Sequence, residues 1–240
     1  IHSSLIFHTH FFIISLRNTF RLENTEIMKN LVIGQSGGPT AVINASLYGA
    51  VKAFRESGAD GHVLGMINGI EGFLADHVMD LSTDLSDKEL ELLKLTPAAY
   101  LGSCRYKLPA DLDSEVYPAI FDNFREMNIG YFLYVGGNDS MDTVDKLSRY
   151  AEKIGSDVKF IGIPKTIDND LVLTDHTPGF GSAAKYVAST VREIVLDASV
   201  YQQKSVTIVE IMGRHAGWLT AASKLARKYE GDNPCLIYLP

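Results

Sequence analysis

Disulfide bonds and excess positive charge are both missing from this sequence. Its 240 residues contain only two cysteines, Cys104 and Cys235, and neither has the CxxC or ligand spacing of a metal site. Two cysteines make no disulfide framework, so we predict a reducing, cytoplasmic location. The net charge of −7 argues against nucleic acid or an anionic membrane surface as a partner. It leaves a phosphorylated substrate open, because a few local cations and backbone amides can outweigh a distant negative charge.

The first 27 residues lack the features of a targeting signal. Two histidines interrupt their apolar stretch, 5–16, which is shorter than the roughly 20 residues that span a bilayer. A secretory signal would also need a basic beginning and a small-residue cleavage site, and both are missing. We therefore expect Met28 to be the natural start, and residues 1–27 to be a non-native or disordered extension.

The rest of the chain has the composition and the pattern of a globular α/β protein. Apolar residues make up 46% and charged residues 21% of the sequence, which is enough for a real core. From residue 28 onward, apolar runs alternate with apolar stripes at helical spacing, which predicts a parallel sheet covered by helices. The expected strands are 31–34, 62–67, 131–135, 160–163, 206–211 and 236–239, and the expected helices are 43–54, 90–95, 117–127, 144–154, 184–195 and 216–228.

Four polar loops directly follow predicted strands. Their sequences are SGGPT (36–40), GGNDS (136–140), PKTIDND (164–170) and MGR (212–214). Ligands of parallel sheets bind outside the carboxyl ends of the strands, so we expect all four loops at one edge of the sheet. Ordinary polar turns would fall at both edges, and this coincidence therefore predicts a binding site.

The glycine pairs in the first two loops would let the backbone approach an anion. Gly37 and Gly38 lie between a strand and a helix, where helix amides can point at a phosphate, although a plain tight turn explains them equally well. In the second loop, an oxygen-bearing side chain could hold Mg²⁺, which prefers hard oxygen ligands. The Asn and Asp residues there could also cap the following helix, and the two roles are compatible.

The third loop has residues suited to phosphoryl transfer. Asp168 in this loop is the candidate general base, and Lys165 beside it is a candidate phosphate-binding cation. Arg105 and Arg214, which lie outside this loop, are two further candidate cations. Phosphoryl transfer depends mainly on positioning and charge neutralisation, for which glycines, cations and a carboxylate are suitable. Each feature also has an ordinary explanation, because Thr and Asp favour turns and most Lys and Arg side chains lie on the surface.

The ordered motifs SGGPTAVINA, GSCR, GGNDS, PKTIDND and MGRHAGW together resemble the phosphofructokinase family, over residues 28–240. The resemblance implies a three-layer, Rossmann-like, parallel-sheet α/β fold, Mg²⁺ as cofactor, and phosphorylation of fructose 6-phosphate at its 1-hydroxyl. It implies that Asp168 deprotonates that hydroxyl and that Thr166 contacts the substrate. The other implied roles are sugar-phosphate binding for Met212, Gly213 and Arg214, and donor binding for Gly37, Arg105 and Ser140.

Two positions within the resemblance indicate the phosphoryl donor. Members that use ATP typically carry GGDGS and PGTIDND, whereas this chain has Asp139 and Lys165 where those motifs have glycine. A carboxylate at 139 would crowd and repel the α-phosphate of ATP, and Lys165 could offer its charge to a shorter donor. The pattern resembles the pyrophosphate-dependent branch, so we expect pyrophosphate as the donor. Asn138 stands where the family commonly has a Mg²⁺-binding Asp, which leaves the metal ligand open.

The resemblance also suggests domain limits. We expect a donor-binding domain over 28–181 and the beginning of a sugar-phosphate-binding domain over 182–240, incomplete because family members continue beyond this point. We therefore expect the 240-residue chain to be poorly active or inactive, and the full-length protein to form a homo-oligomer. Two alternatives stay open: an ATP-dependent phosphofructokinase, and a non-catalytic phosphate- or nucleotide-binding fragment.

Overall fold

The computed structural model describes residues 29–234 and 236–240, so the extension expected over 1–27 lies outside the described residues. The chain divides into two compact units, Ile1–Pro164 and Lys165–Pro240. The domain limit expected between residues 181 and 182 stays a prediction. No helix in the described part of the chain is long and apolar enough to cross a membrane.

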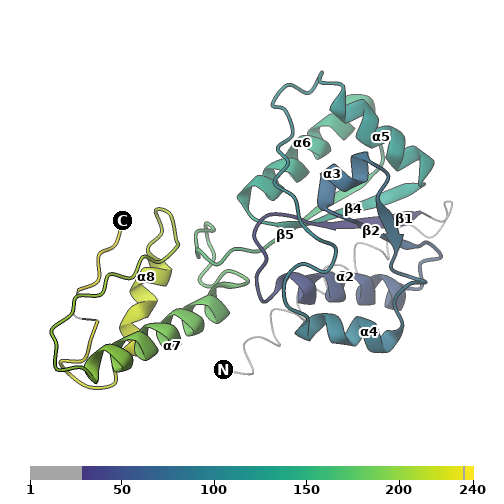
Figure 1. Ribbon diagram of the computed structural model, residues 1–240. Helices are drawn as coiled ribbons and strands as arrows, with labels where there is room; N and C mark the ends of the chain where they lie inside the picture. The colour runs from purple at the N-terminus through teal and green to yellow at the C-terminus, as the bar shows by residue number, and fades with distance from the viewer. Residues whose placement is uncertain (1–28, 235) are drawn as a thin grey trace. The chain divides into compact units, whose positions relative to one another are not determined.

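The first unit is built on a five-stranded sheet with the order β3-β2-β1-β4-β5 (Figure 1). Its central strand β1 pairs in parallel with β2 and β4, and β4 pairs in parallel with β5. Only β3, which was not predicted, is antiparallel, as the partner of β2. The predicted parallel α/β sheet is therefore confirmed. The strands are β1 (Asn30–Gln35), β2 (Val63–Met66), β3 (Val78–Asp80), β4 (Ile129–Gly136) and β5 (Lys159–Pro164).

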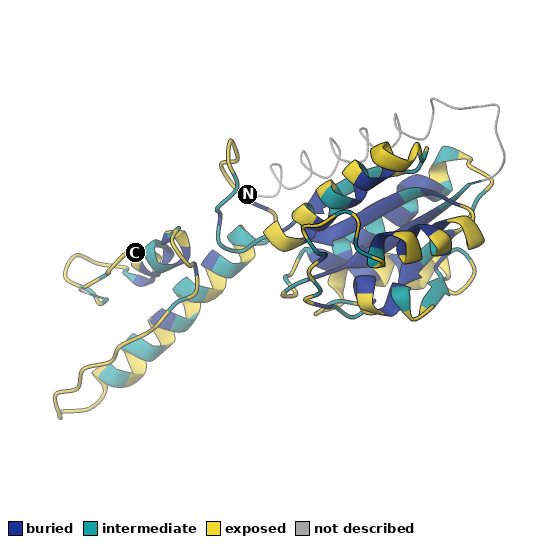
Figure 2. Ribbon diagram, turned by 90° about the horizontal axis from the view of Figure 1, so that it is seen from above, coloured by how far each residue is buried: buried dark blue, intermediate teal, exposed yellow. Residues whose placement is uncertain are grey.

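Helices cover both faces of this sheet and make three layers. Successive side chains of β1 point to opposite faces: Leu31 and Ile33 join one apolar cluster, and Val32 joins the other. All three side chains are fully buried, and Figure 2 shows the sheet strands largely as buried. One face is covered by α2 (Ile43–Ser57), α4 (Asp87–Leu92) and the short helix Leu93–Leu95, and the other by α3 (Gly69–Leu74), α5 (Val116–Glu126) and α6 (Asn138–Ile154).

The helix boundaries in the first unit follow local sequence signals. Gly58 ends α2 in the left-handed conformation, with φ of 74°, which glycine adopts without steric strain. At the start of α4, the Ser86 side chain accepts a hydrogen bond from the Glu89 amide, and the Glu89 carboxylate accepts one from the Ser86 amide. This capping box satisfies two amides that a helix start would otherwise leave unpaired. The sequence predicts both boundaries correctly.

The second unit is helical in its described residues. Helix α7 (Phe180–Ser199) and the shorter α8 (Trp218–Ala222), with the 3₁₀ turn Ser223–Ala226, pack through Ala184, Leu219 and Ala222. The strands predicted over 206–211 and 236–239 are wrong, because neither segment forms a strand. A strand needs a neighbour to satisfy its backbone groups, and the described residues of this unit contain no strand. Val206 and Ile208 are accordingly 92% and 90% exposed.

Candidate active site

Three of the four predicted loops begin at one edge of the sheet. Gln35 of β1 is level with Val135 of β4, and Gly136 of β4 is level with Pro164 of β5. The chain leaves these parallel strands in the same direction, so the SGGPT, GGNDS and PKTIDND loops start side by side, as predicted. The MGR loop is the exception, because the strand expected before it does not form.

The glycine turn after β1 is held against the loop that carries Arg105. Gly37 has φ of 74°, a left-handed conformation that favours glycine. Its amide donates to the Cys104 carbonyl at 3.0 Å, and its own carbonyl accepts a hydrogen bond from Ser103 Oγ at 2.5 Å. The structure therefore brings together two of the predicted donor-binding residues, Gly37 and Arg105, and the Arg105 side chain is exposed.

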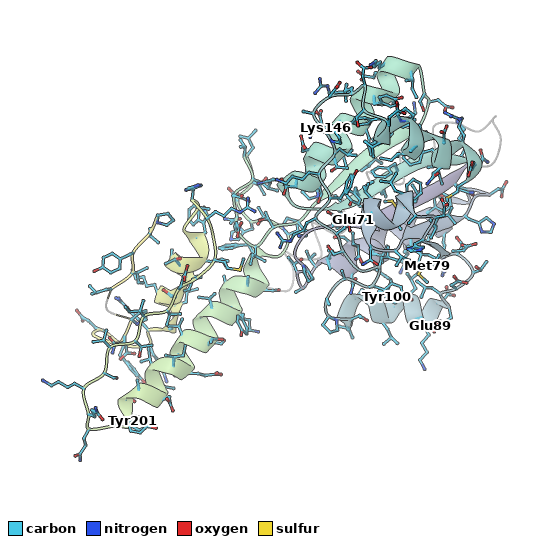
Figure 3. All side chains as sticks on the ribbon, turned by 45° about the horizontal axis from the view of Figure 1, so that its top comes forward. Glu71, Met79, Glu89, Tyr100, Lys146 and Tyr201 are labelled. Atoms are coloured by element: carbon cyan, nitrogen blue, oxygen red, sulfur yellow. The ribbon has the colours of Figure 1, made fainter. Side chains whose placement is uncertain are left out.

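A buried polar network that the sequence analysis missed supports the same loop. Gln35 and Asn44 are 0% and 1% exposed. Gln35 Nε2 donates to Asn44 Oδ1 at 2.9 Å, and Gln35 Oε1 accepts from the Leu101 amide at 2.9 Å. The Asn44 side chain also binds three backbone groups of the loop after α4: it donates to the carbonyls of Thr96 and Ala98 and accepts from the amide of Tyr100, at 2.8–2.9 Å. Tyr100 is labelled in Figure 3. The only sequence signal was an amide side chain beside apolar core positions.

The GGNDS loop turns directly into α6. Gly137 is the N-cap, so neither Asn138 nor Asp139 caps this helix in the way the alternative explanation requires. Both side chains are exposed, whereas Ser140 is 2% exposed. Asp139 lies in the first turn, where the helix dipole favours a negative charge. Its Oδ1 is 3.3 Å from Lys107 Nζ.

Replacing Gly136 with alanine is expected to destabilise this turn. The added Cβ would lie 1.8 Å from Ser140 Oγ and 2.3 Å from Ser140 Cβ, so the buried serine would have to move. Overpacking of this kind typically costs about 1–3 kcal/mol, and urea unfolding of Gly136→Ala would measure it. The control is Gly49→Ala in α2, where the new methyl group meets no atom within 4 Å. It should be neutral or stabilising by up to about 1 kcal/mol, and equal losses in both variants would contradict the prediction.

Thr166 organises the PKTIDND loop within the second unit. Its hydroxyl accepts a hydrogen bond from the Asp168 amide at 3.1 Å and donates to Asp170 Oδ1 at 3.2 Å. Its carbonyl accepts a hydrogen bond from Thr177 Oγ1 at 2.7 Å. Asp170, to which the sequence assigned no role, therefore shapes the loop. The Thr166 hydroxyl therefore fixes the backbone position of Asp168 through the hydrogen bond from the Asp168 amide.

Asp168 is half-buried and holds its proton more tightly than an ordinary aspartate. Burial raises the pKa of its carboxyl group, and the neighbouring Asp170 carboxylate raises it further. The positive charges of Arg214 and Lys165 act in the opposite direction and lower that pKa in part. The predicted base thus lies within the electrostatic influence of two of the predicted cations. A raised pKa suits a general base, because the best catalytic pKa lies near the working pH.

The MGR segment contains Arg214, whose charge lowers the pKa of Asp168. No strand directly precedes this segment in the described part of the chain. Arg214 has φ of 52° and Gly213 has φ of 154°, and positive φ is uncommon for a residue other than glycine. Met212 is 74% exposed. The role of Met212, Gly213 and Arg214 in sugar-phosphate binding stays a prediction, as do the roles of Lys165, Thr166 and Asp168.

A family model described as Phosphofructokinase matches residues 30–239 of the chain. The chain belongs to the phosphofructokinase family. Two relatives are named pyrophosphate--fructose 6-phosphate 1-phosphotransferase: those of Halomonas elongata, 45% identical over 216 residues, and of Rhodospirillum rubrum, 46% identical over 210 residues. Each alignment covers 88% of this chain and 51% or 50% of the relative. This phosphofructokinase chain therefore spans about half the length of the curated relatives it matches.

A solved structure confirms the predicted phosphofructokinase fold. The pyrophosphate-dependent phosphofructokinase from Marinobacter aquaeolei superimposes with a TM-score of 0.78 and is 44% identical in sequence. The match covers 87% of this chain and 52% of that one. The fold and the family thus agree with the ordered motifs.

Proposed function

We propose that the whole protein transfers a phosphoryl group from pyrophosphate to the 1-hydroxyl of fructose 6-phosphate. The products are fructose 1,6-bisphosphate and phosphate. The observation that carries this proposal is Asp168, a half-buried carboxylate whose pKa is raised by burial and by Asp170 and lowered in part by the charges of Arg214 and Lys165. Such a carboxylate beside cations is suited to take a proton from an alcohol while phosphate charge is neutralised. The names of the relatives support the same reaction.

Asp168 accepts the proton of the 1-hydroxyl as that oxygen attacks one phosphorus of pyrophosphate. The bond from this phosphorus to the bridging oxygen breaks, and the other half leaves as phosphate. Lys165 and Arg105 neutralise the charge of the transferred group, and Arg214 binds the 6-phosphate. Thr166 positions Asp168 through the hydrogen bond from the Asp168 amide to its hydroxyl.

Pyrophosphate is favoured over ATP by two side chains. Asp139 presents an exposed carboxylate in the first turn of α6, where an additional phosphate of a longer donor would meet negative charge. Lys165 is only 5% exposed, so its ammonium group acts from a partly desolvated position, where electrostatic interactions are stronger than in water. Both side chains replace the glycines that are typical of members that use ATP.

Mg²⁺ is the expected cofactor, and the residues present fit a metal that is completed by substrate. Among the described residues, no group of three or more His, Cys, Asp or Glu side chains could hold a metal ion. Mg²⁺ commonly takes only one or two protein ligands and completes its shell with substrate phosphates and water. We propose that the Asn138 amide oxygen at the start of α6 is one such ligand. When bound, the ion would neutralise phosphate charge.

The donor assignment can be tested with the whole protein. Turnover with pyrophosphate and not with ATP is expected, and the reverse would contradict the proposal. The double variant Asp139→Gly, Lys165→Gly should use pyrophosphate at least about tenfold less efficiently, the equivalent of about 1.4 kcal/mol. The control variant Asp145→Asn, Lys153→Gln removes one exposed charge of each sign from α6 and should keep its kcat/KM. Ligand binding without any turnover would instead favour a non-catalytic binding protein.

We also propose that the whole protein is a cytoplasmic homo-oligomer with no nucleic-acid or membrane partner. The net charge of −7 supports the absence of anionic partners. Light scattering of the whole protein would give its mass in solution, and a monomeric mass would contradict the oligomer.

A further inference from the structure

Lys107 meets Asp139 from a different part of the chain. Its Nζ is 3.3 Å from Asp139 Oδ1, and the two side chains are 71% and 67% exposed. Ion pairs this exposed contribute little to stability, typically about 0–1 kcal/mol. A stabilising role therefore explains little about this pair. The position of the pair matters more, because Asp139 is one of the two side chains that replace the glycines typical of members that use ATP.

The segment that carries Lys107 is fixed at both ends. On one side, the Cys104 carbonyl accepts hydrogen bonds from the Gly37 amide and from Ser36 Oγ. On the other side, Leu108 is 3% exposed, and its carbonyl accepts a hydrogen bond from Lys146 Nζ at 3.0 Å. Lys146, labelled in Figure 3, belongs to α6. Residues 104–108 are thus attached both to the glycine turn and to the helix that begins with Asn138.

The charges around Lys107 leave Asp139 as its carboxylate partner. Asp142, which lies further along α6, is engaged by Lys146 at 2.6 Å. Arg105 is on the same short segment as Lys107 and has an exposed side chain, but it is Lys107 that reaches the first turn of α6. A pre-arranged cation at this position requires little further ordering when an anion binds.

We propose that Lys107 is a donor-site residue that neutralises Asp139, so that a diphosphate can bind beside a carboxylate. This inference rests on the proposed use of pyrophosphate. Without Lys107, the full charge of Asp139 would repel pyrophosphate as well as ATP, and the carboxylate would exclude the intended donor. Lys107 and Asp139 therefore act as a pair, in which the carboxylate restricts the donor and the lysine makes that restriction compatible with pyrophosphate.

Calorimetric titration of the whole protein with imidodiphosphate and Mg²⁺ tests the charge requirement. Lys107→Gln is expected to raise Kd about fivefold, as for the loss of one exposed charge contact, and Lys107→Arg should stay within about twofold of the unsubstituted protein. The matched control is Lys153→Gln. Lys153 lies near the end of α6 and is ion-paired with Asp113, so this variant also removes an ion-paired lysine. An unchanged Kd in Lys107→Gln would overturn the inference while leaving the proposed function intact.

A double-mutant cycle with Asp139→Asn tests the coupling itself. If Lys107 acts by neutralising Asp139, Lys107→Gln should have a much smaller effect on Kd in the Asp139→Asn background than in the unsubstituted protein. Equal effects in both backgrounds would overturn the inference. If the unsubstituted protein binds no imidodiphosphate and turns over ATP, both the inference and the proposed function fail.

Discussion

Asp168→Asn is expected to lower the kcat of the whole protein by about 10²–10⁴-fold, the range that a general base contributes. The asparagine side chain should fit into the loop, because the hydrogen bond to Thr166 is made by the backbone amide of residue 168 and not by its side chain. The variant should therefore stay folded, and KM for both substrates should change far less than kcat. Initial-rate kinetics would measure both quantities. A variant that keeps a tenth or more of the activity would exclude Asp168 as the base.

The same variant should be at least as stable as the unsubstituted protein near neutral pH. Burial and the Asp170 carboxylate raise the pKa of Asp168 above its ordinary value of 3.8, so the folded state disfavours the ionised form. Below pH 3.8 both states are protonated and this penalty is absent. It grows as the pH rises from 3.8 to the raised pKa of the folded state, and it stays constant above that pKa. The Tm difference between Asp168→Asn and the unsubstituted protein should therefore grow from acidic to neutral pH.

Asp175→Asn is the matched control for this experiment. Asp175 is an exposed carboxylate in the same loop, and its backbone carbonyl, which accepts from Asn169 Nδ2, would be retained. Both its kcat and its Tm profile should follow those of the unsubstituted protein. A stability difference in Asp168→Asn that shrinks toward neutral pH would contradict the raised pKa.

Asn44→Ala should lower the free energy of unfolding by about 3 kcal/mol. The side chain is 1% exposed, and its removal leaves two carbonyls and one amide of the loop after α4 without their partner. Each unsatisfied buried group costs about 1–3 kcal/mol, and the better helix propensity of alanine offsets only about 0.7 kcal/mol of this. Urea denaturation would measure the loss. Limited trypsin digestion should also show faster cleavage after Arg105, because the loop is released locally.

A second asparagine provides the comparison for Asn44. Asn123 in α5 is only half-buried, and its Nδ2 donates to the Phe73 carbonyl at 2.7 Å. Asn123→Ala should lose about 1 kcal/mol and should leave the cleavage rate after Arg105 unchanged. If the two variants lose similar stability, or if cleavage after Arg105 does not accelerate in Asn44→Ala, the network does not hold this loop.

The sequence predicts well those features that depend on neighbouring residues. Gly58 and the Ser86–Glu89 capping box define helix ends locally, and the alternation of strand and helix predicts the parallel sheet. The failed strand at 206–211 has suitable β-branched residues. Strand formation also needs a pairing partner, which no local pattern reports. The local sequence pattern therefore could not predict that residues 206–211 have no partner strand.

The candidate site divides in the same way. Asp168 and Lys165 were identifiable because they stand in a recognisable motif directly after a strand. Lys107 and Asn44 were not, because their importance comes from contacts with residues far along the chain: Asp139 in one case and the loop after α4 in the other. Single positions in a sequence carry no signal for such pairings.

The position of β1 in the sheet has a consequence for how the protein is made. Its register pairs Leu31 with Val63 on one side and with Tyr131 on the other. As a ribosome synthesises the chain, β2 is available soon after β1, but β4 emerges only much later. One edge of this central strand, whose middle is apolar, therefore stays open through most of the synthesis of the first unit. Open strand edges of this kind are where nascent chains associate wrongly, so the sheet depends on its last strands to protect its first.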